Sequence, residues 1–545
     1  MKNFLLSSLA IFALIGCGGG GGSGGDKDDD KGGEPVSKYP KSEKSITVKK
    51  SNEIDKIEKT SNSTLKLSVP KKKDIYLVIT SRFDNQKIAI DSSNSAYTQN
   101  VDYKLTNTIK SDKILTPKNV LAFREKLQEK LHASEDAPLK RQIQSEKRVT
   151  NQYDVRQFYI DVFDIFGNEK TTIIDATARK VVRNVKTKYG YKTLVVWVED
   201  DEYGRRVSQD MVDKLADTFL RHGSNNDLYD WVTNVYGKEW GSTGKANLIA
   251  ETNYIDILID DMGTDGIAGY FYAKDNFTTA AERYSNEKIM FYINSRVYSR
   301  DKYSYDENEK EVLTTLAHEF QHMIHFYQRY VLKDNPHPTW LNEMLSETTE
   351  DLVATKIRYK GPRNVDPDDG SAGPRGNKDG RYPVFNDNNT LSLTKWNNKL
   401  EDYGKVSAFG TFLTRNYNGA KVLHDIEYSK YSGYKAVEEA TKENFKKLVA
   451  KWGAAVVLSD NTNTKVKIPR YNFGDFKNVK YNDITYNLGS INFFNYVPSP
   501  EFRKSATLDE NANLYYHVGE VEGNVTINID IPKGADISII SKEPK

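Results

Sequence analysis

One segment of the chain combines an unbroken helical pattern with two histidines on one helix face. The pattern runs from Glu307 to about Tyr330, and within it the sequence reads His318-Glu-Phe-Gln-His322. Residues four apart on a helix lie about 40° apart around its axis, so both imidazoles can reach one metal ion. The apolar stripe of this helix lies about 120° to 200° from His318, at roughly 100° per residue. We therefore expect the histidines to face away from the core and to bind one zinc ion.

A catalytic zinc ion needs a third protein ligand and one open position for water. The next predicted helix, Trp340 to Ile357, supplies two candidate carboxylates, Glu343 and Glu347. We expect Glu343 to be the third ligand. Glu347 is expected to accept a hydrogen bond from the outer nitrogen of His318 and so to fix its tautomer. An exchange of these two roles is the main alternative, and a merely solvated acidic face is the other.

Glu319, inside the histidine motif, predicts catalysis rather than simple metal binding. A carboxylate beside a zinc-bound water can take the proton of that water as it attacks a peptide carbonyl, and can then pass it to the leaving amine. A structural zinc site has no use for such a base. The residue therefore counts against one alternative function, an adhesin or binding lipoprotein with a vestigial metal site. We expect the strand at Ile289 to Ile293 to be the sheet edge along which a substrate pairs.

These residues resemble a known group of enzymes. His318-Glu-Phe-Gln-His322 followed by Trp340-Leu-Asn-Glu-Met-Leu-Ser-Glu347 is similar to the gluzincin metallopeptidases, and most similar to the hyicolysin family of secreted bacterial zinc peptidases. The resemblance covers about residues 194–458. It implies an α+β, thermolysin-like fold in which a mixed sheet precedes a helical lobe, with the cleft between them. Further matching segments are Gly269-Tyr-Phe-Tyr272, Ser285-Asn-Glu287 and Trp452-Gly-Ala-Ala-Val-Val-Leu458.

The resemblance also implies an activity, that of a zinc endopeptidase acting on protein or peptide substrates. Because gluzincins often place a tyrosine after the ligand helix, it further implies Tyr403 as a donor to the developing oxyanion. With 34 tyrosines in the chain, a core or surface role for Tyr403 is the alternative. An aminopeptidase is the alternative activity, but the GxMEN-like motif of one gluzincin group is absent upstream of His318.

The first residues predict export. Met1 and Lys2 precede an apolar run from Phe4 to Ile15, a signal peptide (residues 1–16) too short to span a bilayer. The sequence Leu-Ile-Gly-Cys17 resembles a bacterial lipobox, in which Cys17 is lipidated; an ordinary cleaved signal is the alternative. Residues 17–45, rich in glycine and charge, are interpreted as a flexible tether. We expect an exported lipoprotein whose partner is a membrane, at the bacterial cell surface or envelope.

The rest of the chain is divided by its patterns into three parts. Residues 46–188 are mostly strand-like and are expected to form a β-rich module, a candidate propeptide, with a helical insertion at 120–147. Residues 189–458 form the expected peptidase domain. Residues 459–545 return to alternating strands and predict a small C-terminal β-sandwich.

Charge and cysteine content exclude several classes of protein. The chain has 78 Lys and Arg against 76 Asp and Glu, a net charge of +2. Nucleic-acid binding needs a concentrated basic face, so no nucleic-acid partner is expected. The single cysteine excludes an intramolecular disulfide.

Two weaker signals concern further ligands. The loop Asp366-Pro-Asp-Asp-Gly370 has features of a calcium site, and thermolysin-like enzymes bind calcium, but a plain loop is the better interpretation. His325 lies about 10.5 Å beyond His318 along the helix axis, at 1.5 Å per residue, so it is too far to share the ion. A local hydrogen bond is its expected role.

Overall fold

The computed structural model describes most of the chain from residue 38 onward. The described ranges are 38–93, 116–133, 149–164, 166, 168–223, 227–299, 305–361, 363, 365–373 and 380–544, with the side chains of 305–309 left out. All of them belong to one unit, Ser37–Lys545. The predicted signal peptide, Cys17 and most of the predicted tether lie outside these ranges. Among the described helices, none combines the length and the apolar character that crossing a bilayer requires.

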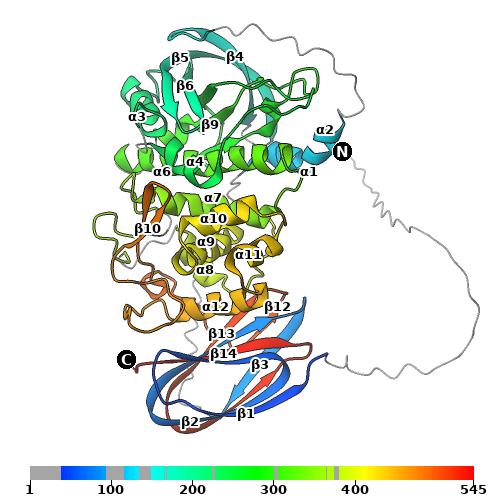
Figure 1. Ribbon diagram of the computed structural model, residues 1–545, viewed down its shortest axis with the longest axis vertical. Helices are drawn as coiled ribbons and strands as arrows, with labels where there is room; N and C mark the ends of the chain where they lie inside the picture. Colours follow the sequence, from blue (N-terminus) through cyan, green and yellow to red (C-terminus); the bar gives the residue numbers. More distant parts are fainter. Residues whose placement is uncertain are drawn as a thin grey trace, which may run out of the picture. The chain divides into compact units, whose positions relative to one another are not determined.

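A mixed six-stranded sheet supports the helix that contains the histidine motif, and its strand order is β4-β5-β6-β7-β9-β8 (Figure 1). Strands β6, β7 and β9 are parallel, and the other neighbours are antiparallel. A fully buried run, Val195–Val198, makes β6 a central strand. The strands are β4 (Val155–Phe163), β5 (Glu169–Thr187), β6 (Gly190–Glu199), β7 (Tyr254–Asp260), β8 (Gly269–Phe271) and β9 (Met290–Asn294).

The edge of this sheet differs from the prediction. We expected the strand at 289–293 to form the edge, but β9 lies inside the sheet, between β7 and β8. The three-residue strand β8 takes the edge. Its first residue, Gly269, approaches β9 so closely that a Cβ there would lie 2.6 Å from the carbonyl oxygen of Tyr292. The prediction failed because a three-residue strand has too few residues to show a periodic pattern.

Helices of the sheet region pack on the sheet and on each other. They are α3 (Gln209–Phe219), α4 (Leu228–Tyr236), α5 (Ser295–Tyr298) and α6 (Tyr305–His325). Helix α6 continues as a π-helical turn, η2 (Phe326–Val331). A 3-10 turn, η1 (Ala273–Asn276), follows β8. Ser208 caps α3 by accepting a hydrogen bond from the Met211 N–H at 3.3 Å, as its N-cap position predicted. In α6, Phe320 packs against Phe291 of β9 and Phe219 of α3. The apolar stripe of α6 thus faces the sheet.

A second group of helices follows. They are α7 (Thr339–Ala354), α8 (Arg381–Asp387), α9 (Leu400–Asn416), α10 (Ala420–Tyr428), α11 (Tyr434–Thr441) and α12 (Phe445–Val457), followed by the hairpin β10 (Lys477–Tyr481) and β11 (Ile484–Leu488) and the 3-10 turn η3 (Phe493–Asn495). Helix α7 lies beside α6 and is buried along nearly its whole length (Figure 1). The polar side chains on the face of α7 that meets α6 are therefore shielded from water. They must form their hydrogen bonds with other groups of the protein.

The two ends of the described chain form one β domain. Its sheet has the order β1-β2-β13-β3-β12, and β14 pairs with β2 (blue and red strands in Figure 1). Strand β2 pairs with β13 from Ser63↔Ile529 to Thr80↔Asn513. The strands are β1 (Lys41–Thr47), β2 (Glu53–Ser81), β3 (Gln86–Ser92), β12 (Ser505–Leu508), β13 (Asn513–Asp530) and β14 (Ala535–Lys542).

This pairing corrects the predicted division of the chain. Residues 46–188 do not form one module, because β1–β3 complete the C-terminal sheet whereas β4 and β5 belong to the mixed sheet that also contains β6–β9. Likewise, 459–545 is not a separate sandwich. The last residues of the predicted tether, from Lys41, form β1. Alternation along a sequence predicts strands but not their partners, which explains the error. Removing β1–β3 as a propeptide would leave β13 and β14 without their neighbours.

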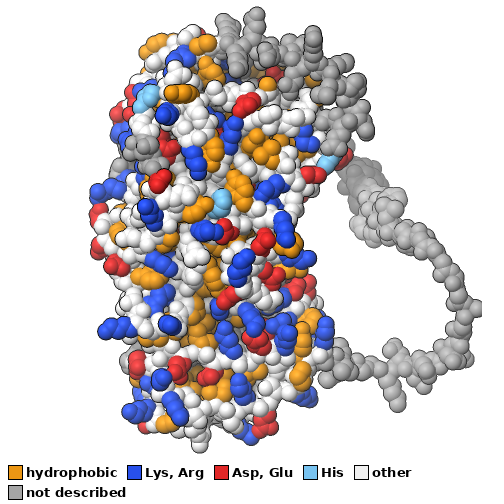
Figure 2. Space-filling model, in the orientation of Figure 1, with side chains coloured by type: hydrophobic (Ala, Val, Ile, Leu, Met, Phe, Trp, Pro, Cys, Tyr) orange, Lys and Arg blue, Asp and Glu red, His pale blue; other side chains and the backbone are white. Residues whose placement is uncertain are grey.

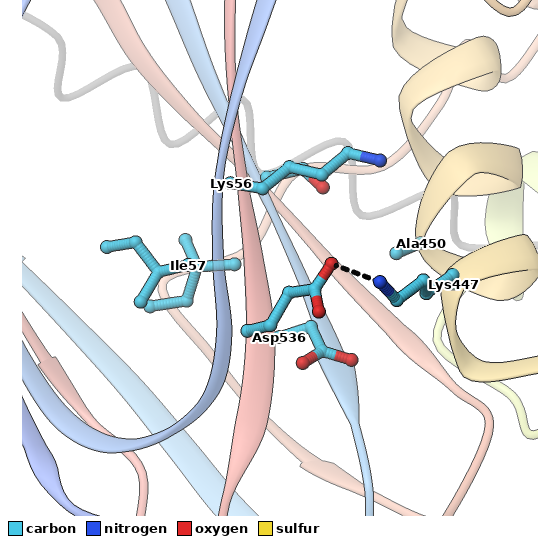
Figure 3. A pocket seen from close by; sticks show the side chains of 8 residues that line it. Lys56, Ile57, Lys447, Ala450 and Asp536 are labelled. Carbon is cyan, nitrogen blue, oxygen red and sulfur yellow. Dashed lines mark ion pairs between the residues drawn. The ribbon is translucent and has the colours of Figure 1, made fainter. Parts of the chain in front are cut away.

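A small pocket lies where the β domain meets α12 (Figure 3). The dashed line in the figure is the ion pair of Lys447 on α12 with Glu58 on β2, 3.1 Å long. The nearby Asp536 pairs instead with Arg82 at 2.7 Å. These charges are satisfied by one another, and we assign the pocket to domain packing.

The surface shows mixed charge. On the face drawn in Figure 2, Lys and Arg side chains are interspersed with Asp and Glu side chains rather than gathered into one basic field. This pattern agrees with the near-zero net charge of +2.

Candidate metal centre

Helices α6 and α7 bring three ligand-type side chains to one point. The Nε2 atoms of His318 and His322 each lie 3.3 Å from Oε2 of Glu343. All three ligand atoms fall within 4.8 Å of one another. The histidines face α7 because the opposite face of α6 is packed on the sheet. The structure thus brings together the three residues that the sequence suggested as ligands.

The surroundings of Glu343 fit a metal ion. Its Oε2 atom is buried and has no well-aligned hydrogen bond, although two imidazole nitrogens lie beside it. A buried carboxylate oxygen without a partner is costly unless something positive occupies the space between it and its neighbours. Two imidazoles and one carboxylate are the donor set of a catalytic zinc site, with a fourth position left for water.

Protonation in the cluster depends on burial and on the nearby carboxylates. Burial lowers the pKa of His322 to about 4, so this imidazole is neutral at pH 7, as a metal ligand must be. Burial alone would also lower the pKa of His318, but its contacts with Glu343 and Glu350 raise it. Burial alone would raise the pKa of Glu343, but the imidazoles beside it hold it well below its usual range. The cluster therefore carries the carboxylate charge that a cation needs.

The outer nitrogens of both histidines are hydrogen-bonded by α7. Nδ1 of His318 lies 2.9 Å from Oε1 of Glu350, and Nδ1 of His322 lies 3.2 Å from Oδ1 of Asn342. Ser346 Oγ also lies 3.1 Å from Nδ1 of His322. Such partners hold the rings so that both Nε2 atoms face Oε2 of Glu343.

The prediction for Glu347 was wrong. Glu347 lies near His318, but its oxygens accept hydrogen bonds from Nε of Arg381 on α8, at 2.9 and 3.0 Å. Glu350 takes the predicted role because a residue seven positions after Glu343 returns to within about 20° of it around the helix, whereas a residue four positions on lies about 40° to the other side. Arg381, far away in the sequence, then pairs with Glu347.

Glu319 is held by the edge strand. Its Oε2 accepts a hydrogen bond from the backbone N–H of Phe271, in β8, at 2.9 Å. Burial raises its pKa to about 7. A carboxylate with this pKa exchanges a proton readily near neutral pH, which suits a general base. No feature of the sequence pointed to Phe271 as its partner.

Tyr403 lies beside the cluster without bonding to a ligand. It is buried on α9, and its hydroxyl lies 3.2 Å from Oγ1 of Thr116 and 3.4 Å from Oδ1 of Asn398. Burial, and then the charge of Glu343, raise its pKa. A catalytic role for Tyr403 stays a proposal.

Arg124 is a residue of the site that sequence reasoning missed. It lies on α1 (Lys118–Glu125), and its Nη1 donates to Oε1 of Glu343 at 3.0 Å. More than 200 residues separate the two, and no motif joins them. His325, by contrast, turns away from the cluster as expected, and its Nδ1 lies 3.0 Å from Oε2 of Glu427.

The suggested calcium loop shows no metal-binding cluster. Asp366 accepts a hydrogen bond from the N–H of Asp368 at 2.8 Å, and Asp368 pairs with Arg358. Among the residues that the structure describes, both groups able to hold a metal include His318.

Comparison with known proteins identifies the family. The model of the family described as Peptidase M30 matches residues 175–541, well over half of the chain. The chain belongs to the peptidase M30 family. This M30 chain is 26% identical to neutral metalloprotease ShpI of Staphylococcus hyicus over 388 residues, which cover 67% of this chain and 75% of the relative. The predicted hyicolysin-family membership is confirmed, and the chain is a metallopeptidase.

A solved structure shows a weaker similarity to this M30 peptidase. It is that of Legionella pneumophila aminopeptidase A in complex with aspartic acid, with a TM-score of 0.30 and 11% identity. The match covers 55% of this chain and a third (33%) of that chain. A similarity at this level decides neither the fold nor the activity, so the predicted thermolysin-like fold stays a prediction.

Proposed function

We propose that this metallopeptidase is a zinc endopeptidase in which His318, His322 and Glu343 hold the ion and Glu319 is the general base. The observation that carries the proposal is the convergence of two imidazole nitrogens on one buried, otherwise unpartnered carboxylate oxygen, 3.3 Å from each. A second buried carboxylate, Glu319, stands beside them and is fixed by a backbone N–H. Together these groups make up a metal site and a base.

The side chains divide the chemistry between them. His318, His322 and Glu343 would hold the zinc ion, which would supply a Lewis acid and lower the pKa of a bound water. Glu319 takes a proton from the attacking water and donates it to the leaving amine, which its raised pKa of about 7 permits in both directions. Glu350 positions His318 through Nδ1. Tyr403 is our candidate donor to the developing oxyanion.

We place the substrate backbone along β8. This strand is the edge of the metal-binding sheet, and its Phe271 is in contact with Glu319. An extended peptide added beside β8 would carry its carbonyl groups past the base. Export and lipidation of Cys17, and hence a location at the bacterial surface, stay predictions from residues 1–17.

Peptides with an acetylated N-terminus distinguish endopeptidase from aminopeptidase activity. We expect the zinc-loaded chain to cleave a quenched fluorescent peptide equally well with a free or an acetylated N-terminus, because the GxMEN-like motif of one gluzincin group is absent upstream of His318. Dipicolinate should abolish cleavage, and zinc should restore it.

The contrary results are specific. Cleavage of the free peptide alone would show an aminopeptidase. Stoichiometric zinc binding without any cleavage, in the intact chain and in its variants Phe123→Ala and Arg124→Ala, would favour the binding lipoprotein.

A further inference from the structure

A short helical segment lies across the metal centre. It consists of α1 and α2 (Leu127–His132), drawn in cyan beside α6 and α7 in Figure 1. On the sheet side, the ring of Phe123 packs edge-on against Tyr272, which directly follows β8, and Phe277, which follows η1, with ring centroids 5.6 Å apart in both pairs. On the helical side, Thr116 contacts Tyr403 of α9 at 3.2 Å. The segment therefore contacts both sides of the site.

Arg124 occupies the centre of this contact. Its guanidinium donates to Oε1 of Glu343, the oxygen next to the one that faces the two imidazoles, at 3.0 Å. The carboxylates of Glu343 and Glu319 are among its nearest charges. The Arg124 guanidinium therefore competes with any hydrogen-bond donor or positive group of a substrate that would approach Glu343 or Glu319.

Further ion pairs fasten the ends of the segment. Lys130 pairs with Glu282 at 2.6 Å, and His132 lies 3.0 Å from Asp334. At the start of α1, Glu169 accepts a hydrogen bond from the N–H of Asn119 at 2.7 Å. All of these partners belong to the peptidase region. The ion pairs are at least partly exposed, and pairs of this kind contribute little to stability, so they fix position without preventing release.

The four side chains of the site are buried. Exposure is 7% for His318, 8% for Glu319, 3% for His322 and 1% for Glu343. An endopeptidase must admit an extended chain to its ion and its base, and side chains this deeply buried offer little surface for that contact. Helix α1 contacts both the segment that follows β8, through Phe123 and Tyr272, and the proposed metal ligand Glu343, through Arg124.

We propose that residues 116–133 form an autoinhibitory cover that occupies the place of a peptide substrate between β8 and α7, with Arg124 bound to the metal ligand Glu343. The proposal rests on the proposed function and adds its regulation. It also reduces the part of residues 46–188 that could act as a propeptide to the α1–α2 segment. Strands β1–β5 are integral to the two sheets, whereas α1 and α2 contribute no strand to either. Peptides and the cover then compete for one site.

The activity test uses two substitutions in the cover and one control, all in the intact, zinc-loaded chain. Phe123→Ala and Arg124→Ala should each raise kcat/KM for a blocked peptide about tenfold, as expected if the wild-type site is open about a tenth of the time. Lys126→Ala removes a cation from an exposed position of the same segment and should change the rate less than about twofold. Equal, non-zero rates in all variants, or a fall in Arg124→Ala, would overturn the cover.

A second measurement needs no turnover. Amide hydrogen exchange in peptides spanning 118–132 is followed with and without a dipeptide hydroxamate, which binds a zinc peptidase at the substrate position. We expect bound hydroxamate to accelerate exchange in this segment, because it displaces α1. Unchanged or slower exchange would overturn the proposal. If every variant lacks activity but hydroxamate still releases the segment, the peptidase mechanism fails and the cover stands.

Discussion

Replacement of Glu319 by Gln is expected to lower kcat/KM for a blocked peptide by about 10²- to 10⁴-fold, the usual contribution of a general base. The amide keeps the size of the side chain and can still accept the hydrogen bond from Phe271, so the fold and the ligand geometry should persist. Because Glu319 is not one of the three ligands, zinc content should stay at one ion per chain. Steady-state kinetics and atomic emission spectroscopy on the same sample measure both quantities.

The comparison must be made in a matched background. If the wild-type chain cleaves the peptide too slowly for a loss of about 100-fold in activity to be measured, Glu319→Gln is combined with Phe123→Ala. The double variant is then compared with Phe123→Ala alone. Activity within about threefold of the parent would remove Glu319 as the base, since loss of a base costs at least about 100-fold. Loss of zinc in the variant would instead make Glu319 a ligand, contrary to the observed geometry.

Replacement of Glu343 by Gln is expected to have the second large effect, on metal binding. Glu343 supplies the one anionic oxygen between the two imidazoles, and its loss should weaken zinc affinity by more than the roughly 10- to 100-fold typical of an outer hydrogen-bonding partner. Competition with a chromogenic zinc chelator measures this directly. The variant also leaves the Arg124 guanidinium without its charged partner, so release of α1 is expected to become easier.

Glu347→Gln is the matched control. It lies on the same helix, one turn away, and also lies near His318, but it is hydrogen-bonded to Arg381. Zinc affinity should fall far less than in Glu343→Gln. The reverse order of effects would exchange the two roles, which was the main alternative that the sequence left open.

The parts of the site that the sequence predicted are those set by helix geometry alone. His318 and His322 share a face because they are four residues apart, and the apolar stripe that includes Phe320 fixes which way that face turns. Glu343 could be suggested because a single short connection joins its helix to α6. These inferences needed only local spacing and the donor preferences of zinc.

The parts that were missed depend on contacts between distant segments. The partner of Glu347, Arg381 of α8, was missed because the position of α8 is a tertiary property. Arg124 meets Glu343 from the other end of the peptidase region. In the same way, β2 looks complete as a strand in the sequence, but its main partner, β13, lies more than 400 residues further on.

The most direct test of the account is anomalous diffraction from a crystal of the zinc-loaded chain, measured above and below the zinc absorption edge. We predict a single strong peak about 2.0–2.2 Å from Nε2 of His318, Nε2 of His322 and a carboxylate oxygen of Glu343. A peak at the alternative acidic group formed by His318, Glu347 and Glu350, or no peak within reach of His322, would contradict it.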